Sequence, residues 1–410
     1  MPLTTLLLIL FLSFHCTKGY HPEVALSFEE RARYHGYPVE VYQVETEDDY
    51  LLMLYRIPYG AGQKHSESRN KSAILILHGN GGTPHNFLVL GKEKAAAFYF
   101  ADKGLDVWLL ASRGIFGTFK QKHKKYDWNK DPEFWNFSYH EIGIYDVPAA
   151  IDFILNATDQ KKVTLIGHSS GGMVCFCLFS EKPEYVDKVK LQINWGSSPI
   201  IEKLDFPFLV FLTSLSSLVK GLINYLGLVE LPFHSEILSV LQEWSEDPYW
   251  KQLCVFVIQS VGSRKSVLQR LQDVELIVMS IPRFSLRQEK HLLDAIYYGG
   301  ARKYDFGQKK NMEVYGQPLP GEYNLSATTV PTAFFVGSND GFIGKLDVES
   351  SIRRLPNTIF YEEVQFDKFN HLDFIFAHNA SELVYEPTYQ LIRNIDMGII
   401  PPKVKVPPES

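Results

Sequence analysis

The sequence has few cysteines and no surplus of basic residues, and both shortages limit what the protein can be. Its 410 residues include four cysteines, and 41 Lys plus Arg stand against 47 Asp plus Glu. A net charge of -6 gives no basic field for nucleic acid, and no cysteine spacing is typical of a zinc site. Cys175 and Cys177 are too close for an ordinary disulfide within one regular element, so we expect them to pack as small apolar groups.

Long uncharged runs are also scarce. One apolar run, residues 6–14, is too short to span a bilayer as a helix and is followed by Thr17-Lys-Gly19. This pattern predicts that residues 1–19 are a cleaved secretory signal, with a buried N-terminal strand as the alternative. Cys16 leaves with that signal, and Cys254 remains as the third cysteine of the mature chain.

Five Asn-x-Ser/Thr sequons support the secretory route, because each one is an acceptor for N-glycosylation. They are Asn70, Asn136, Asn156, Asn324 and Asn379. We therefore expect a glycoprotein of the lysosomal lumen or of the extracellular space.

Short β-type runs alternate with longer helical patterns through most of the chain. This alternation predicts an α/β fold, with a mostly parallel sheet covered by helices on both faces. Each run ends in Gly or a small polar residue, and chemistry in such sheets lies at the carboxyl ends of the strands. The runs are 73–77, 106–110, 163–166, 189–194 and 332–336.

The alternation stops between two of these strands, where a long segment with a mainly helical pattern takes its place. We interpret the interruption as an inserted cap or lid, whose run 208–229 is broken by Lys220 and Asn224 and is expected to be buried or interfacial. The predicted organisation divides the chain into five parts. They are signal 1–19, first part of the core 20–198, cap 199–322, second part of the core 323–400, and a proline-rich, disordered tail 401–410.

The pattern Gly-x-Ser-x-Gly stands where the strand 163–166 meets a helical stretch. Such a turn is so tight that small residues must flank the serine, here Gly167 and Gly171. Ser169 is therefore the candidate nucleophile, and Ser170 opens the helix with a backbone N–H that can donate to an oxyanion. The alternative is a merely structural turn.

A serine hydroxyl needs a base and an acid, and on this type of fold they follow the serine in the order Asp or Glu, then His. Asp340 follows the strand 332–336, and His371 follows a further strand at 359–364. Two residues compete with this pair. Asp373 could serve as the acid, and His378 as the base, although His378 adjoins a sequon.

The second oxyanion donor is expected from the glycine-rich loop 77–82, with the backbone N–H of Asn80 as the candidate. A phosphate-binding loop is the alternative. It would need the ending Gly-Lys-Ser/Thr and a basic partner, and the loop has neither.

With these residues in view, the chain resembles the acid lipase family of the α/β-hydrolase fold, which includes gastric lipase and lysosomal acid lipase. The similarity runs from about residue 22 to residue 395. It is carried by His35-Gly-Tyr-Pro38, Arg56-Ile-Pro-Tyr-Gly60, Ser112-Arg-Gly114, Asp131-Pro-Glu-Phe-Trp135, the turn 167–171 and Asn370-His-Leu-Asp-Phe374. By this resemblance the family's catalytic triad maps onto Ser169, Asp340 and His371.

The chain departs from the family at several positions. Asn80 stands where the family usually has Leu, and Ser170 where it usually has Gln. The cap agrees least, and Cys254 lacks the partner with which the family closes a cap disulfide.

The sequence therefore predicts a serine ester hydrolase that cleaves apolar lipid esters through an acyl-enzyme, without metal or cofactor. The resemblance implies triacylglycerols or steryl esters as substrates. Expected partners are the lipid ester and the lipid–water interface, with no nucleic acid and no transmembrane span, and the sequence indicates no particular oligomeric state. A catalytically silent lipid carrier on the same fold, and a serine peptidase, are the alternatives.

Overall fold

The computed structural model describes residues 22–63, 71–115, 121–201, 216–230, 239–244, 247, 250–253, 256 and 274–406. The strands are β1 (Glu40–Glu45), β2 (Tyr50–Ile57), β3 (Ala73–Leu77), β4 (Asp106–Ala111), β5 (Lys122–His123), β6 (Val163–His168), β7 (Val189–Trp195), β8 (Thr332–Val336) and β9 (Thr358–Glu363).

Helices alternate with these strands. The α-helices are α2 (Phe28–Tyr34), α3 (Ala96–Asp102), α4 (Tyr139–Glu141), α5 (Val147–Thr158), α6 (Ser170–Glu181), α8 (Ser216–Tyr225), α11 (Val274–Met279), α12 (Leu286–Tyr298), α13 (Gln308–Tyr315), α14 (Lys345–Arg354), α15 (Asp373–Phe376) and α16 (Glu386–Asp396). Short 3-10 and π turns are η2 (Pro84–Phe87), η3 (Pro132–Trp135), η4 (Ile142–Asp146), η5 (Pro183–Lys188), η7 (Leu325–Ala327) and η8 (Ser381–Tyr385).

One sheet organises the chain, with the strand order β1-β2-β4-β3-β6-β7-β8-β9 and with β5 paired to β2. The neighbouring pairs along β4-β3-β6-β7-β8-β9 are parallel. Strand β2 is antiparallel to β1, β4 and β5. The predicted α/β fold with a mostly parallel sheet is confirmed, and the predicted strands match β3, β4, β6, β7, β8 and β9. The antiparallel strands were not among the predicted ones.

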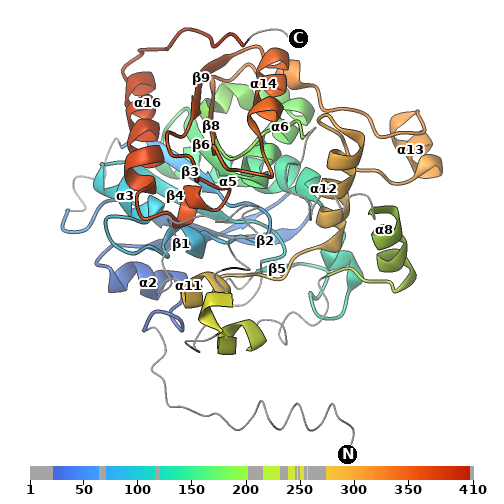
Figure 1. The fold of residues 1–410 in the computed structure, drawn as a ribbon, viewed down its shortest axis with the longest axis horizontal. Coiled ribbons are helices and arrows are strands. Elements are labelled where there is room, and N and C mark those ends of the chain that lie inside the picture. Colours follow the sequence, from blue (N-terminus) through green and yellow to red (C-terminus); the bar gives the residue numbers. More distant parts are fainter. Residues whose placement is uncertain are drawn as a thin grey trace, which may run out of the picture.

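Both faces of the sheet are covered (Figure 1). Alternate residues of a strand point to opposite faces, so Ile74 and Ile76 of β3 belong to one apolar cluster, while Leu75 and Leu77 belong to the other. The first cluster includes side chains of α3 and α16, and the second includes side chains of α5, α6 and α14. The central strands are therefore buried on both sides, which fixes the position of their carboxyl ends.

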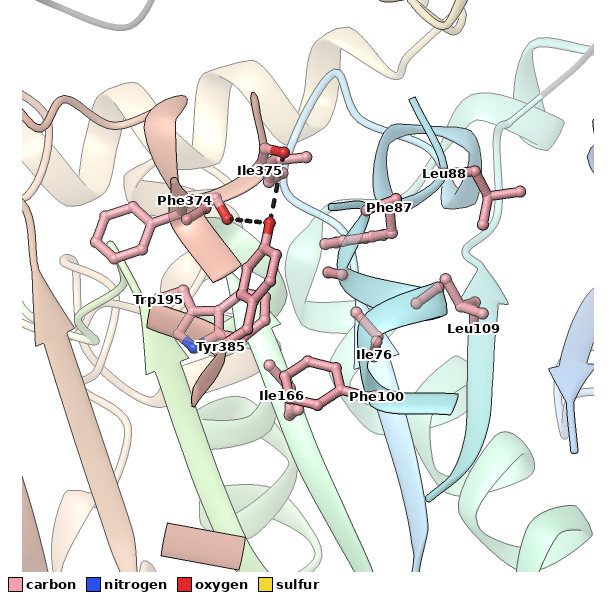
Figure 2. Packing of buried hydrophobic residues seen from close by; sticks show 14 of the residues in the cluster. Ile76, Phe87, Leu88, Phe100, Leu109, Ile166, Trp195, Phe374, Ile375 and Tyr385 are labelled. Atoms are coloured by element: carbon pink, nitrogen blue, oxygen red, sulfur yellow. Dashed lines mark hydrogen bonds between the residues drawn. The ribbon is translucent and has the colours of Figure 1, made fainter. Parts of the chain in front are cut away.

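Figure 2 shows how the first cluster holds the segment after β9. The hydroxyl of Tyr385 donates to the carbonyl of Phe374 at 2.9 Å, and its ring stacks on Trp195 at the end of β7 with 5.3 Å between centroids. Trp195 in turn donates to Thr388 of α16 at 3.1 Å. Helix α15, which begins two residues after His371, is thus tied to the sheet.

The described part of the predicted cap is helical. It lies between β7 and β8 in the chain and contains α8, α11, α12 and α13. Ser285, the residue before α12, anchors that helix to the core, because its hydroxyl lies 2.7 Å from the Trp135 carbonyl and 2.8 Å from the Phe137 carbonyl. The cap boundaries themselves stay a prediction, and Cys254 lies outside the described residues.

The prediction of a disordered tail is wrong for residues 401–406. The N–H of Val404 donates to the carbonyl of Thr358 at 2.8 Å, and Val404 and Val406 pack against the second cluster. Prolines exclude a helix there but leave the chain free to lie extended beside β9. The predicted signal 1–19 and the sequon at Asn70 lie outside the described residues.

Two expectations about apolar groups can be compared with the structure. Cys175 and Cys177 are buried and free, as predicted. Within the described ranges, the helices fall short of the length and apolar character that a membrane crossing requires.

A buried ion pair fixes the end of β4. Arg113 is 1% exposed and contacts Asp146 at 2.7 Å and Asp48 at 2.6 Å, while Asp146 is fully buried. Burial raises the pKa of Asp146 to about 6, against the opposing effect of Arg113. Without the guanidinium, the Asp146 carboxylate would be an uncompensated charge in the interior.

We therefore expect Arg113→Met to lower the free energy of unfolding by about 3–5 kcal/mol at pH 7. The loss should shrink as the pH falls toward 5, since protonation of Asp146 removes the unpaired charge. Lys124→Met is the control, because its pair with Glu45 is about half exposed, and it should cost less than about 1 kcal/mol. Urea unfolding curves give the free energy of unfolding of both variants. Equal losses in the two variants would contradict the role of Arg113 as the partner of a buried carboxylate.

Candidate active site

Ser169 occupies the turn between β6 and α6 in a strained conformation. Its φ of 54° and ψ of -129° lie in a region that a residue with a side chain rarely adopts. The turn is held at both ends, since Ser169 N donates to the Trp195 carbonyl and Gly172 N donates to the Ser169 carbonyl, each at 3.0 Å. Ser170 is the first residue of α6, as predicted.

The glycines around Ser169 have no room for a side chain. A Cβ on Gly167 would lie 2.3 Å from the N of Gly172, and one on Gly171 would lie 2.4 Å from the carbonyl oxygen of Leu77. A Cβ on Gly79 would lie 2.8 Å from the Cβ of Ser169. The loop after β3 is therefore packed directly against the candidate nucleophile.

His371 and Asp340 form a buried pair. The two atoms His371 Nδ1 and Asp340 Oδ2 are 2.7 Å apart, and the side chains are 7% and 0% exposed. The other carboxylate oxygen of Asp340 accepts from the N–H groups of Phe342 at 2.9 Å and Ile343 at 3.0 Å. These bonds orient the carboxylate so that His371 donates through Nδ1 and keeps Nε2 as an acceptor.

The two competing residues have other partners. Asp373 accepts at 2.8 Å from the N–H of Asn370, within its own loop. His378 lies beside Lys94, with 3.3 Å between His378 Nδ1 and Lys94 Nζ. The carboxylate that contacts His371 is therefore that of Asp340.

The serine turn and the His–Asp pair meet at the same edge of the sheet. His168, next to Ser169, has its Nε2 2.9 Å from the carbonyl oxygen of His371, and the two rings are 4.9 Å apart. A Cβ on Gly196, directly after β7, would lie 3.1 Å from Asp340 Oδ2. The carboxyl ends of β6, β8 and β9, with β7 between β6 and β8, thus bring the three candidate triad residues into one region.

The sequence analysis assigns no role to His168. The pattern Gly-x-Ser-x-Gly allows any residue at that position, so it does not predict the contact with His371. Burial and the nearby His371 lower the pKa of His168 to about 3. The ring therefore stays neutral and can donate one hydrogen bond to the His371 carbonyl, which helps to seat the backbone of that residue.

The candidate oxyanion donors are free to bind a ligand. Among the residues that the structure describes, none accepts a hydrogen bond from the backbone N–H of Asn80 or of Ser170. The first N–H groups of a helix have no intrahelical acceptor, which explains Ser170. Gly79 places the loop that carries Asn80 against Ser169.

A mostly apolar cavity of about 350 Å³ opens at this edge. Its polar lining includes the loop 78–82 and His168. Its apolar wall includes Ile277, Val278 and Phe284 of the cap and Ile375 and Phe376 of α15. In the described part of the chain, no group of three or more His, Cys, Asp or Glu side chains is arranged to hold a metal ion.

The comparisons with known proteins agree with this geometry. A model described as the partial α/β-hydrolase lipase region matches residues 28–91, and one described as the α/β-hydrolase fold matches residues 72–227. Human lysosomal acid lipase/cholesteryl ester hydrolase is 32% identical over 384 residues, which cover 91% of this chain and 92% of the human protein. The chain belongs to the acid lipase family of α/β-hydrolases.

This acid lipase family member is also similar to a second lipase and to a solved structure. Bovine gastric triacylglycerol lipase is 32% identical over 391 residues, which cover 91% of this chain and 92% of the bovine protein. Among solved structures, the α/β-hydrolase GrgF from Penicillium sp. sh18 is similar with a TM-score of 0.51 and 14% identity, over 88% of this chain and 99% of that one. The last comparison shows the fold alone.

The predicted glycosylation sites differ in exposure. Asn136, Asn156 and Asn324 are exposed, whereas Asn379 is half-buried and its side-chain oxygen is enclosed. The first three are therefore the more accessible acceptors among the described sequons.

The tight packing at the turn yields a prediction. Gly171→Ala would push the loop after β3 away from Ser169, so we expect kcat/KM on a soluble ester to fall by about 10²-fold and stability by about 1–3 kcal/mol. Gly321→Ala is the control, since the nearest atom to its Cβ is 3.9 Å away, and it should retain activity. Esterase kinetics and melting curves check both, and a fully active Gly171→Ala would refute the steric account.

Proposed function

We propose that the protein is a serine ester hydrolase that cleaves apolar lipid esters. The observation that carries the proposal is the buried pair of His371 and Asp340 at the same sheet edge as the strained Ser169. His168 links the two and lines a mostly apolar cavity. A buried His–Asp pair with a free imidazole nitrogen supplies the base that a serine nucleophile requires.

In the proposed reaction the Ser169 Oγ attacks the ester carbonyl while its proton passes to His371 Nε2. The tetrahedral oxyanion accepts hydrogen bonds from the N–H groups of Asn80 and Ser170. His371 then gives the proton to the departing alcohol, which leaves an acyl group on Ser169. Water attacks the acyl-enzyme by the same route and releases the fatty acid, while Asp340 holds the imidazole in its donor orientation.

The apolar wall of the cavity supports a long-chain acyl group as the part of the substrate that is buried. Triacylglycerols and steryl esters both fit this class, in line with the names of the gastric and lysosomal relatives. The predicted signal, the sequons and these relatives support export through the secretory pathway, to the lysosomal lumen or to the outside of the cell.

Helix α8 of the cap supports contact with a lipid surface. Leu218, Leu222 and Tyr225 are 70%, 54% and 87% exposed, although they are large apolar side chains. The free energy falls when such an apolar face leaves water for a lipid–water interface. We therefore propose α8 as part of the surface that adsorbs to the lipid aggregate.

Replacement of the nucleophile separates the hydrolase from a silent lipid carrier on the same fold. Ser169→Ala should reduce hydrolysis of a chromogenic acyl ester by about 10⁴ to 10⁶-fold, because the triad acts as a unit. The melting temperature should not fall, since the substitution removes only the hydroxyl and no packing contact that the fold requires. If the variant keeps more than a few per cent of the wild-type rate, Ser169 is not the nucleophile, and a wild type without turnover would favour the carrier.

A charge on α8 tests the lipid-adsorbing surface. Leu222→Glu should weaken adsorption by roughly 1.5–3 kcal/mol and slow hydrolysis of an emulsified long-chain ester, with a dissolved short-chain ester unaffected. Leu346→Glu is the matched control, because Leu346 is 53% exposed on α14, a helix of the core rather than the cap. Equal loss on both substrates, or equal effects of the two variants, would rule out the interfacial role of α8.

A further inference from the structure

The side chain of Asn80 is held by two consecutive residues of the cap helix α12. Gln288 Nε2 donates to Asn80 Oδ1 at 2.8 Å, and Asn80 Nδ2 donates to Glu289 Oε1. Both ends of the amide are therefore occupied, and both partners come from the cap. An apolar side chain at position 80 could make neither bond.

Helix α12 is itself fixed to the core on both sides of these two residues. Before them, the Ser285 hydroxyl binds the carbonyls of Trp135 and Phe137. After them, His291 Nδ1 lies 3.0 Å from the hydroxyl of Ser138. Gln288 and Glu289 therefore project from a rigid support toward the loop after β3.

Glu289 is a partly buried acidic group that the proposed reaction does not use. Burial raises the pKa of Glu289, and the hydrogen bond from Asn80 acts in the opposite direction. A carboxyl group in such surroundings costs free energy unless a donor satisfies it. Asn80 is the donor that the structure gives it, so the two side chains constrain each other.

We propose that Glu289 and Gln288 are positioning residues that hold Asn80 so that its backbone N–H stays directed at the oxyanion formed on Ser169. The proposal rests on the proposed function, in which that N–H stabilises the tetrahedral intermediate. Because Gly79 packs against Ser169 without space for a Cβ, a small rotation of the loop at Asn80 moves the donor relative to the nucleophile. The cap thus contributes to the chemical step as well as to the cavity wall.

Four variants test this role on a soluble ester. Glu289→Ala should lower kcat by about 10- to 100-fold and change KM by less than about threefold, since the lost interaction acts in the transition state. Glu289→Gln keeps an acceptor for Asn80 Nδ2 and should restore kcat to within about threefold of wild type. Asn80→Ala should resemble Glu289→Ala, and the double variant should be no slower than either one, because both changes break the same link.

Tyr297→Ala is the matched control for helix α12. Its side chain is 61% exposed, eight positions after Glu289, and its removal should leave kcat unchanged. A boronic acid that mimics the tetrahedral intermediate gives an independent readout, since its affinity should fall in parallel with kcat. Additive losses in the double variant, or a change in KM and melting temperature alone, would overturn the positioning role.

The Ser169→Ala variant separates failure of this role from failure of the proposed function. If wild type hydrolyses the ester, Ser169→Ala does not, and Glu289→Ala equals wild type, the positioning role alone is wrong. If Ser169→Ala keeps the wild-type rate, the proposed function is wrong and the positioning role falls with it.

Discussion

The backbone of Ser169 is held in a left-handed conformation, and the arrangement of the site depends on the packing that keeps it there. Such a conformation costs of order 1–3 kcal/mol, so the surrounding structure has to impose it. Gly167, Gly171 and Gly79 allow the sheet, helix α6 and the loop after β3 to approach within distances that no Cβ would permit. That close approach leaves the first N–H of α6 without an acceptor among the described residues and brings the loop of Asn80, the proposed second oxyanion donor, alongside Ser169.

The His–Asp pair is placed by a different kind of constraint. Asp340 and His371 follow β8 and β9, so the sheet sets their positions, and local backbone N–H groups and the Tyr385 hydroxyl fix their loops. His168 joins the two halves, because it is part of the serine turn and contacts the carbonyl of His371. A neutral, buried imidazole suits this structural task, since its pKa is too low for it to compete as a base.

The sequence predicts well what neighbouring residues or strand order determine. The parallel strands, the start of α6 at Ser170 and the pairing of His371 with Asp340 rather than Asp373 all follow from local pattern and chain order. The link between Asn80 and Glu289 does not, because it joins residues far apart in the chain and depends on how the cap docks. The extended path of residues 401–406 was also missed. The prolines argue against a helix in this segment, but they do not predict that it packs beside β9.

The central claim is that Ser169 is a nucleophile activated by the His371–Asp340 pair, and covalent labelling tests it most directly. A fluorophosphonate should modify the wild-type protein once, and peptide mass spectrometry should place the label on Ser169. In Asp340→Asn, where the imidazole loses the carboxylate that fixes its tautomer, labelling should be slower by about 10⁴-fold. A label on Ser170 or elsewhere, or an equal rate in Asp340→Asn, would contradict the account.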